Sequence, residues 1–136
     1  KGLSPEGIAE TGRSAEVAKG YRVPVSAIRH SGKKRARQTA EIFAAALIPG
    51  VAPEEAGGLN PLDDVITYAE GLNPRDHLML VGHLPFMERL TSQLITGASD
   101  GKVFRFQNSG IVCLDLDTDT GAWVMQWTLM PNIGGS

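Results

Sequence analysis

Two short segments of the sequence carry the groups that could hold an anion. The first is His30-Ser31-Gly32-Lys33-Lys34-Arg35, and the second is Val81-Gly82-His83-Leu84-Pro85. A guanidinium offers phosphate oxygens a planar fork of donors. An imidazole can donate a hydrogen bond or a proton to the same oxygens. The two segments together therefore predict a phosphate-binding pocket built around Arg35 and His83.

Each segment falls where a predicted strand gives way to a predicted helix. Residues 25–30 are rich in β-branched side chains, and residues 77–82 form an apolar run typical of a strand buried on both faces. Strong helix formers occupy residues 34–47, and a second helix is expected from Pro85 onward. In open α/β sheets, ligands bind beyond the carboxyl ends of the strands, where helix N-termini offer unpaired N–H groups. We therefore expect His83 and Arg35 to face one shared cleft.

The remaining elements complete a layered α/β domain that spans residues 1–136. A helix is predicted from Pro5 to Gly20, because Ser4 supplies an N-cap, Pro5 suits the first helical position and Glu6 is a first-turn acid. Residues 50–60 are rich in Gly and Pro and indicate an irregular connection, and a helix is predicted from residue 61 to about 72. Residues 110–117 and 122–129 are expected to form a C-terminal hairpin.

Composition excludes several classes of partner and cofactor. The chain of 136 residues has 13 Lys and Arg against 15 Asp and Glu, so excess positive charge does not favour a nucleic-acid or anionic-membrane binder. Three histidines and one cysteine do not suffice for a zinc site, and there is no glycine-rich nucleotide loop. A single cysteine cannot form an internal disulfide, which favours a reducing cytoplasm. We expect no cofactor and no metal, and the oligomeric state stays open.

Less specific interpretations exist for the same residues. The cationic run Lys33–Arg37 is typical of a solvated helix face, and a basic nucleic-acid patch is a further reading of it. Within that run, Arg37 is interpreted as a surface charge. His30 is expected to be a neutral residue packed beside the pocket, and His77 a solvated residue at a strand entrance. Cys113 lies in an apolar pattern and is expected to be a small buried hydrophobe.

Residues 31–42 resemble the second signature of the histidine phosphatase superfamily, in which a Ser is followed after a few residues by Arg-Ala-x-Gln-Thr-Ala. Residues 80–85 resemble the Gly-His-x-Pro element of the same family. Residues 3–7 and 59–61 are similar to its Leu-Thr-x-x-Gly and Leu-x-Pro segments. The order and the small size are most similar to those of the bacterial SixA-type phosphohistidine phosphatases.

This resemblance implies a three-layer α/β/α fold of the phosphoglycerate mutase type, with a mostly parallel sheet. It also implies metal-independent removal of the phosphoryl group from phosphohistidine of a signalling or phosphotransfer protein, through a phosphohistidine enzyme intermediate. Arg35 matches the arginine that holds the phosphoryl oxygens, and His83 matches the histidine that binds the phosphoryl group during transfer. Ser31 is expected to help shape the phosphate pocket.

Two other functions stay open beside this one. A small-molecule phosphate-ester phosphatase would need a general acid for its leaving group, and the sequence does not single one out among Glu54, Glu55, Asp63 and Asp64. A non-catalytic module that binds phosphate would keep the arginine and the histidine without a nucleophile.

One element of the family is absent from these 136 residues. The family begins with a strand ending in Arg-His-Gly, whose histidine is the nucleophile, and the sequence before Leu3 does not contain it. In the family that strand occupies the middle of the sheet, so its loss would leave strand edges unpaired and a gap in the core. We therefore expect an upstream segment in the natural protein, and we expect the 136 residues alone to be inactive.

Overall fold

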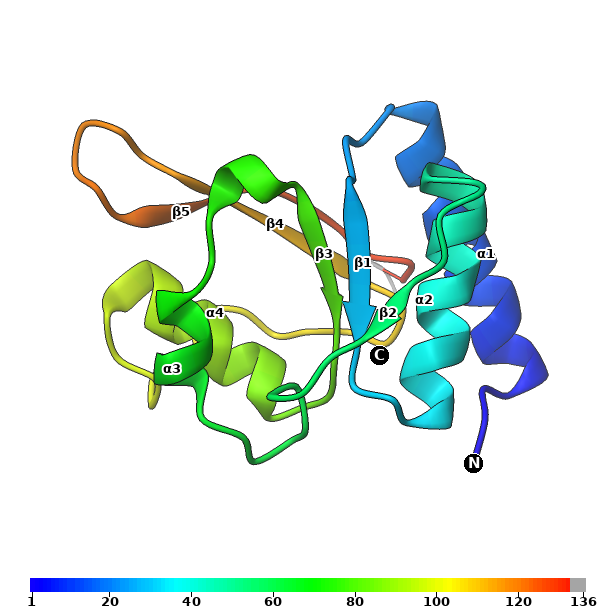
Figure 1. Ribbon diagram of the computed structural model, residues 1–136, viewed down its shortest axis with the longest axis horizontal. Helices are drawn as coiled ribbons and strands as arrows, with labels where there is room; N and C mark the ends of the chain where they lie inside the picture. Colours follow the sequence, from blue (N-terminus) through cyan, green and yellow to red (C-terminus); the bar gives the residue numbers. More distant parts are fainter. Residues whose placement is uncertain (133–136) are drawn as a thin grey trace.

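Helices and strands alternate along the chain, as the sequence predicts (Figure 1). The computed structural model describes residues 1–132. The helices are α1 (Pro5–Gly20), α2 (Lys34–Leu47), α3 (Val65–Glu70), the 3-10 helix η1 (Pro74–Asp76) and α4 (Phe86–Thr96). The strands are β1 (Ala27–His30), β2 (Glu54–Glu55), β3 (Leu78–Val81), β4 (Ile111–Leu116) and β5 (Trp123–Leu129).

The first three strands form a parallel sheet in the order β2-β1-β3. His30 at the end of β1 is opposite Glu55 of β2 and Val81 of β3, so the three strands end at the same edge of the sheet. The strands β4 and β5 pair with each other as an antiparallel hairpin. Helices α1 and α2 lie on one side of the parallel strands, and α3 and α4 lie on the other (Figure 1). This arrangement confirms the predicted α/β fold with a C-terminal hairpin.

The helix expected from residue 61 to about 72 is shorter than predicted. Helix α3 begins after Asp64, whose side chain accepts hydrogen bonds from the backbone N–H groups of Ile66 at 2.9 Å and Thr67 at 3.4 Å. These bonds satisfy two of the N–H groups that a helix start leaves unpaired. The carboxylate cap, rather than Pro61, therefore sets the start of this helix.

Two strands also differ from the prediction. Strand β2 lies inside the segment expected to be irregular, and its two exposed residues are too few to give a sequence pattern. Strand β3 was expected to be buried on both faces, but all four of its residues are only half-buried. Within residues 1–132, β3 pairs with β1 alone, so its second edge lacks a strand to cover it.

Two apolar clusters hold the layers together. The first joins α1, β1 and α2 through Ala15, Ile28, Ala40, Phe43 and Ala44. The second joins α3 and α4 through Leu59, Val65, Phe86 and Leu90. In the second cluster the rings of Tyr68 and Phe86 meet edge to face with centroids 5.8 Å apart, a favoured aromatic geometry. The clusters lie on either side of β3 and fix the directions of α2 and α4.

In the part of the chain that the structure describes, no helix has both the length and the apolar character needed to cross a membrane.

Candidate active site

The carboxyl edge of the parallel sheet brings the two predicted anion-binding segments together. Strand β1 ends at His30 and is followed by Ser31, and the neighbouring strand β3 ends at Val81 and is followed after one residue by His83. The hydroxyl oxygen of Ser31 lies 2.6 Å from Nε2 of His83, a hydrogen bond between residues 52 positions apart. Side chains from two separate strand-to-helix junctions therefore share one site.

The first junction depends on a glycine. Gly32 has a φ of +90°, which L-amino acids with a side chain rarely adopt. Its backbone N–H donates to Nδ1 of His30 at 3.0 Å, and the N–H of Lys33 donates to the hydroxyl of Ser31 at 3.3 Å. A side chain at position 32 would also come within 2.6 Å of the carboxylate carbon of Glu55. The turn thus holds Ser31 between β1 and α2.

The second junction also has a glycine where space is limited. A Cβ at Gly82 would lie 2.9 Å from the sulfur of Met87 and 3.3 Å from the carbonyl oxygen of Leu59. The carbonyl of His83 then accepts the N–H of Met87 at 3.0 Å, which ties the histidine to the first turn of α4. This close packing fixes His83 between β3 and α4.

The helices that follow the two junctions lack the caps found elsewhere in the molecule. Helix α1 is capped by Ser4 and α3 by Asp64, both through side-chain hydrogen bonds. Among the described residues, α2 and α4 have no such side-chain cap. Unpaired N–H groups and the positive end of the helix dipole favour an anion at these positions.

Burial and nearby charges act on His83 in the same direction. The half-buried position lowers the pKa of the imidazole below its ordinary value, and the positive charges of Lys33 and Arg35 lower this pKa further. His83 is therefore mainly neutral at pH 7. A bound anion would reverse the charge effect and favour the protonated imidazole.

Arg35 and His83 both line one large groove of about 1050 Å³. Its lining includes all of β3, most of β4 and the residues that precede β4, together with residues of α1, α2 and α4. Arg35 is exposed in the first turn of α2, whereas Arg37 is exposed and does not line the groove. Ser31 bonds to His83, and Arg35 lies close enough to His83 to lower its pKa, while the roles of all three residues in binding and catalysis stay predictions.

The other histidines lie in different surroundings. His30 is buried, with 4% of its surface exposed, and its Nδ1 is occupied by the N–H of Gly32. His77 is exposed at the start of β3, at the opposite end of that strand from His83. Both positions agree with the structural interpretations made from the sequence.

Cys113 is half-buried in β4, so the expectation of a buried residue holds only in part. Burial and the charge of Asp115 raise the pKa of the thiol. Since the thiolate is the nucleophilic form, this environment disfavours a catalytic role for Cys113.

The structure separates the four acidic residues that the sequence left equivalent. Glu54 pairs with Arg29 at 3.6 Å, Asp63 accepts the N–H of Asn60 at 2.8 Å, and Asp64 caps α3. Only Glu55 has its carboxylate against Gly32, beside the junction that carries Ser31. The pairing of β2 with β1 creates this proximity, so no local sequence signal could have identified Glu55.

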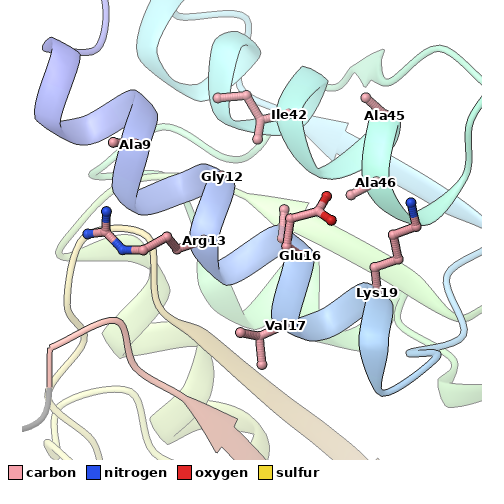
Figure 2. Close-up of a pocket in the computed structure, with 10 residues that line it drawn as sticks. Ala9, Gly12, Arg13, Glu16, Val17, Lys19, Ile42, Ala45 and Ala46 are labelled. Atoms are coloured by element: carbon pink, nitrogen blue, oxygen red, sulfur yellow. The ribbon is translucent and has the colours of Figure 1, made fainter.

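Two further observations bear on what the site can hold. Among residues 1–132, no cluster of three or more His, Cys, Asp or Glu side chains is arranged to hold a metal ion. A second hollow of about 680 Å³ lies between α1 and α2 (Figure 2). Ala, Gly and Ile residues make up most of its lining, with three charged side chains from α1. Because the hollow lacks a nucleophile or an imidazole, the groove carries the candidate site.

Comparisons with known proteins agree with this assignment of the fold. No protein-family model matches the sequence, and no curated protein matches it. Among solved structures, the protein histidine phosphatase SixA complexed with tungstate superposes with a TM-score of 0.79 and 25% identity, over 96% of this chain and 84% of that one. The SixA protein of Agrobacterium tumefaciens superposes with a TM-score of 0.73 and 26% identity, over 96% of this chain and 83% of that one. The chain therefore has the fold of the SixA-type histidine phosphatases.

Proposed function

We propose that this protein removes the phosphoryl group from phosphohistidine of a protein substrate. The proposal rests on His83 at the carboxyl edge of a SixA-like sheet, bonded to Ser31 and close enough to Arg35 for that charge to lower its pKa. The structural neighbours named above support the same reaction, since one is described as a protein histidine phosphatase.

The site has groups suited to binding a phosphoryl group and stabilising its charge. Catalysis of this reaction consists largely of positioning and of stabilising the charge on the transferring group. Arg35 supplies a fixed positive charge and paired donors, and His83 supplies an imidazole that gains positive charge as the phosphoryl group binds. Ser31 holds His83 through the 2.6 Å hydrogen bond. In this proposal, Arg35 and His83 bind and orient the phosphoryl group.

The nucleophile is proposed to come from outside residues 1–132. The resemblance implies that a histidine attacks the phosphorus, which breaks the bond to the substrate imidazole and forms a bond to the enzyme imidazole. Water then attacks the phosphorus, the bond from phosphorus to the enzyme imidazole breaks, and inorganic phosphate leaves the regenerated histidine. His30 is unsuited to this role because its ring is buried and its Nδ1 is occupied. His77 lies at the far end of β3.

The rival substrate is a small phosphate ester. An ester leaving group needs a proton from a general acid, and Glu55 is the acid that the structure places beside the site. Among the described residues, this carboxylate is the one observation that favours esters. Replacing Glu55 by Gln should lower ester hydrolysis far more than phosphohistidine hydrolysis if esters are the substrates.

The experiment is a dephosphorylation assay on a phosphohistidine protein. Two forms are compared, the 136 residues alone and the same residues preceded by an Arg-His-Gly strand, each with and without His83→Ala. We expect turnover only in the longer form, with loss of turnover in its His83→Ala variant. Turnover by the short form that disappears in His30→Ala would mean that His30 is the nucleophile. Tight phosphate binding without turnover in either form would favour the non-catalytic binding module.

A further inference from the structure

Large apolar side chains are exposed beside the candidate active site. Leu62, Ile66 and Leu84 come from the loop before α3, from the first turn of α3 and from the turn before α4. Leu62 is 83% exposed, Ile66 52% and Leu84 48%. A single exposed apolar residue is ordinary on a protein surface, whereas several of them beside a binding site indicate a contact surface. We call these three residues the apolar rim.

The buried core beneath the apolar rim holds its segments together. Leu59 and Val65 pack with Phe86 in one apolar cluster, and all three side chains are fully buried. Leu62 lies between the first two in the sequence, and Leu84 lies two residues before the third. The segments of the rim are therefore fixed to the core before any partner binds. Such preorganisation lowers the entropy cost of docking.

The segments of the apolar rim border His83. Leu84 is the next residue after His83, and on its other side a Cβ at Gly82 would lie 3.3 Å from the carbonyl oxygen of Leu59. Figure 1 shows the loop between β2 and α3, and the start of α4, at the end of the molecule toward which β1 points. A protein that brings a phosphoryl group to His83 would therefore cover part of the rim, whereas a small anion would leave it exposed.

Positive charge lies at the other strand-to-helix junction. Lys33, Lys34 and Arg35 are consecutive and exposed, and the charges of the first and the third act on His83. Glu55 is the acid beside this junction, and the carboxylates of the loop before α3 accept N–H groups of their own segment. Helix α2, which contains two of these cations, lies across the parallel strands from α3 and α4 (Figure 1). The surroundings of His83 therefore fit a partner that has apolar residues on one side and acidic residues on the other.

We propose that the apolar rim and the cations Lys33–Arg35 form a docking surface for the protein substrate, and that this surface selects a phosphohistidine flanked by apolar and acidic residues. The proposal rests on the proposed function for the phosphoryl group itself. It adds the chemistry of the surface around that group, which a small phosphate ester would not use.

The test measures binding by isothermal titration, so it needs no turnover. The probe is a short peptide with a central phosphoryltriazolylalanine, a stable analogue of phosphohistidine, with Leu on both sides of it and Glu at both ends. One matched peptide has Ser in place of Leu, and another has Gln in place of Glu. We expect Leu62→Ser to weaken binding of the Leu peptide by about five- to twentyfold, because an apolar contact is lost. Binding of the Ser peptide and of inorganic phosphate should change by less than about twofold.

Tyr21→Ser is the matched control, since Tyr21 is 81% exposed and precedes β1, at the opposite edge of the sheet. Lys34→Gln should weaken binding of the Glu peptide by about two- to fivefold and leave the Gln peptide unchanged. Equal affinities for the Leu and Ser peptides, or equal losses in Leu62→Ser and Tyr21→Ser, would overturn the docking surface while phosphate binding persists. A chain that binds neither the peptides nor inorganic phosphate would overturn the proposed function, and the docking surface with it.

Discussion

His30 and His83 follow neighbouring parallel strands, yet their surroundings differ in every respect that matters for chemistry. His30 is buried, and its Nδ1 accepts the N–H of Gly32 within the turn. His83 is half-buried and lines the groove. Its Nε2 is hydrogen-bonded to the hydroxyl of Ser31, a contact that a bound ligand can replace. Two positive side chains lie close enough to His83 to lower its pKa. Two histidines at similar positions in the fold therefore differ in role: His30 stabilises a turn, whereas His83 is accessible to a phosphoryl group in the groove.

The largest expected difference between the two histidines is in catalysis. In the protein that carries an Arg-His-Gly strand, His83→Ala should lower kcat for phosphohistidine hydrolysis by roughly 10²–10³-fold, the usual effect of removing a donor that stabilises the transition state. His30→Ala should change kcat by less than about tenfold where the variant is folded, because the ring does not reach the groove. Single-turnover rates of both variants measure the difference. A greater loss from His30→Ala would reverse the assignment.

A second difference is expected between two arginines of α2, Arg35 and Arg37, in how much each contributes to phosphate binding. Arg35→Ala should weaken phosphate binding by about 10–150-fold, since a hydrogen-bonded charge contributes roughly 1.5–3 kcal/mol. Arg37→Ala should weaken it by less than about fivefold, because an exposed charge outside the groove contributes about 0–1 kcal/mol. Isothermal titration with phosphate gives both values. Equal losses would indicate a diffuse basic surface instead of a pocket.

The order of effects should reverse when stability is measured. His30→Ala leaves the N–H of Gly32 without its partner and removes a buried ring, which should lower the free energy of unfolding by about 1–3 kcal/mol. His83→Ala should lower the free energy of unfolding by less than about 1 kcal/mol, because truncating a half-buried side chain removes fewer packing contacts than truncating a buried one. Urea unfolding of the two variants provides the comparison. A more destabilising His83→Ala would assign a structural role to that residue.

The sequence predicted the parts of the site that local signals encode. The strand-to-helix junctions and the limits of α2 follow from apolar runs, helix formers and glycines, and the structure has them. Two features depend on contacts distant in the chain, and neither has a signature in a short window of sequence. Glu55 reaches the site only because β2 pairs with β1, and the half-exposed β3 reflects its single partner. The side-chain cap at Asp64 is local, and an N-cap signal at Asp64 competes there with the helix-start signal at Pro61.

The smallest expected effect is the pH dependence of anion binding. Because the pKa of His83 is lowered below its ordinary value, the imidazole is mainly neutral at pH 7. A bound anion raises this pKa, so binding takes up a proton and the affinity must increase as the pH falls below about 6.5. Sulfate is a suitable probe because it remains a dianion throughout this range. We expect several-fold tighter sulfate binding at pH 5.5 than at pH 7.5, and a flatter profile in His83→Ala.

The most direct test of the site is to follow the three histidine rings by ¹⁵N NMR while sulfate is added. If His83, Arg35 and Ser31 form one anion site, the ring nitrogens of His83 should shift and its pKa should rise as sulfate binds. The same assignment predicts that the buried ring of His30 keeps its shifts, and that Arg35→Ala removes the response of His83. A response centred on His30, or a His83 ring that is insensitive to sulfate at every pH, would contradict the assignment of the phosphoryl site.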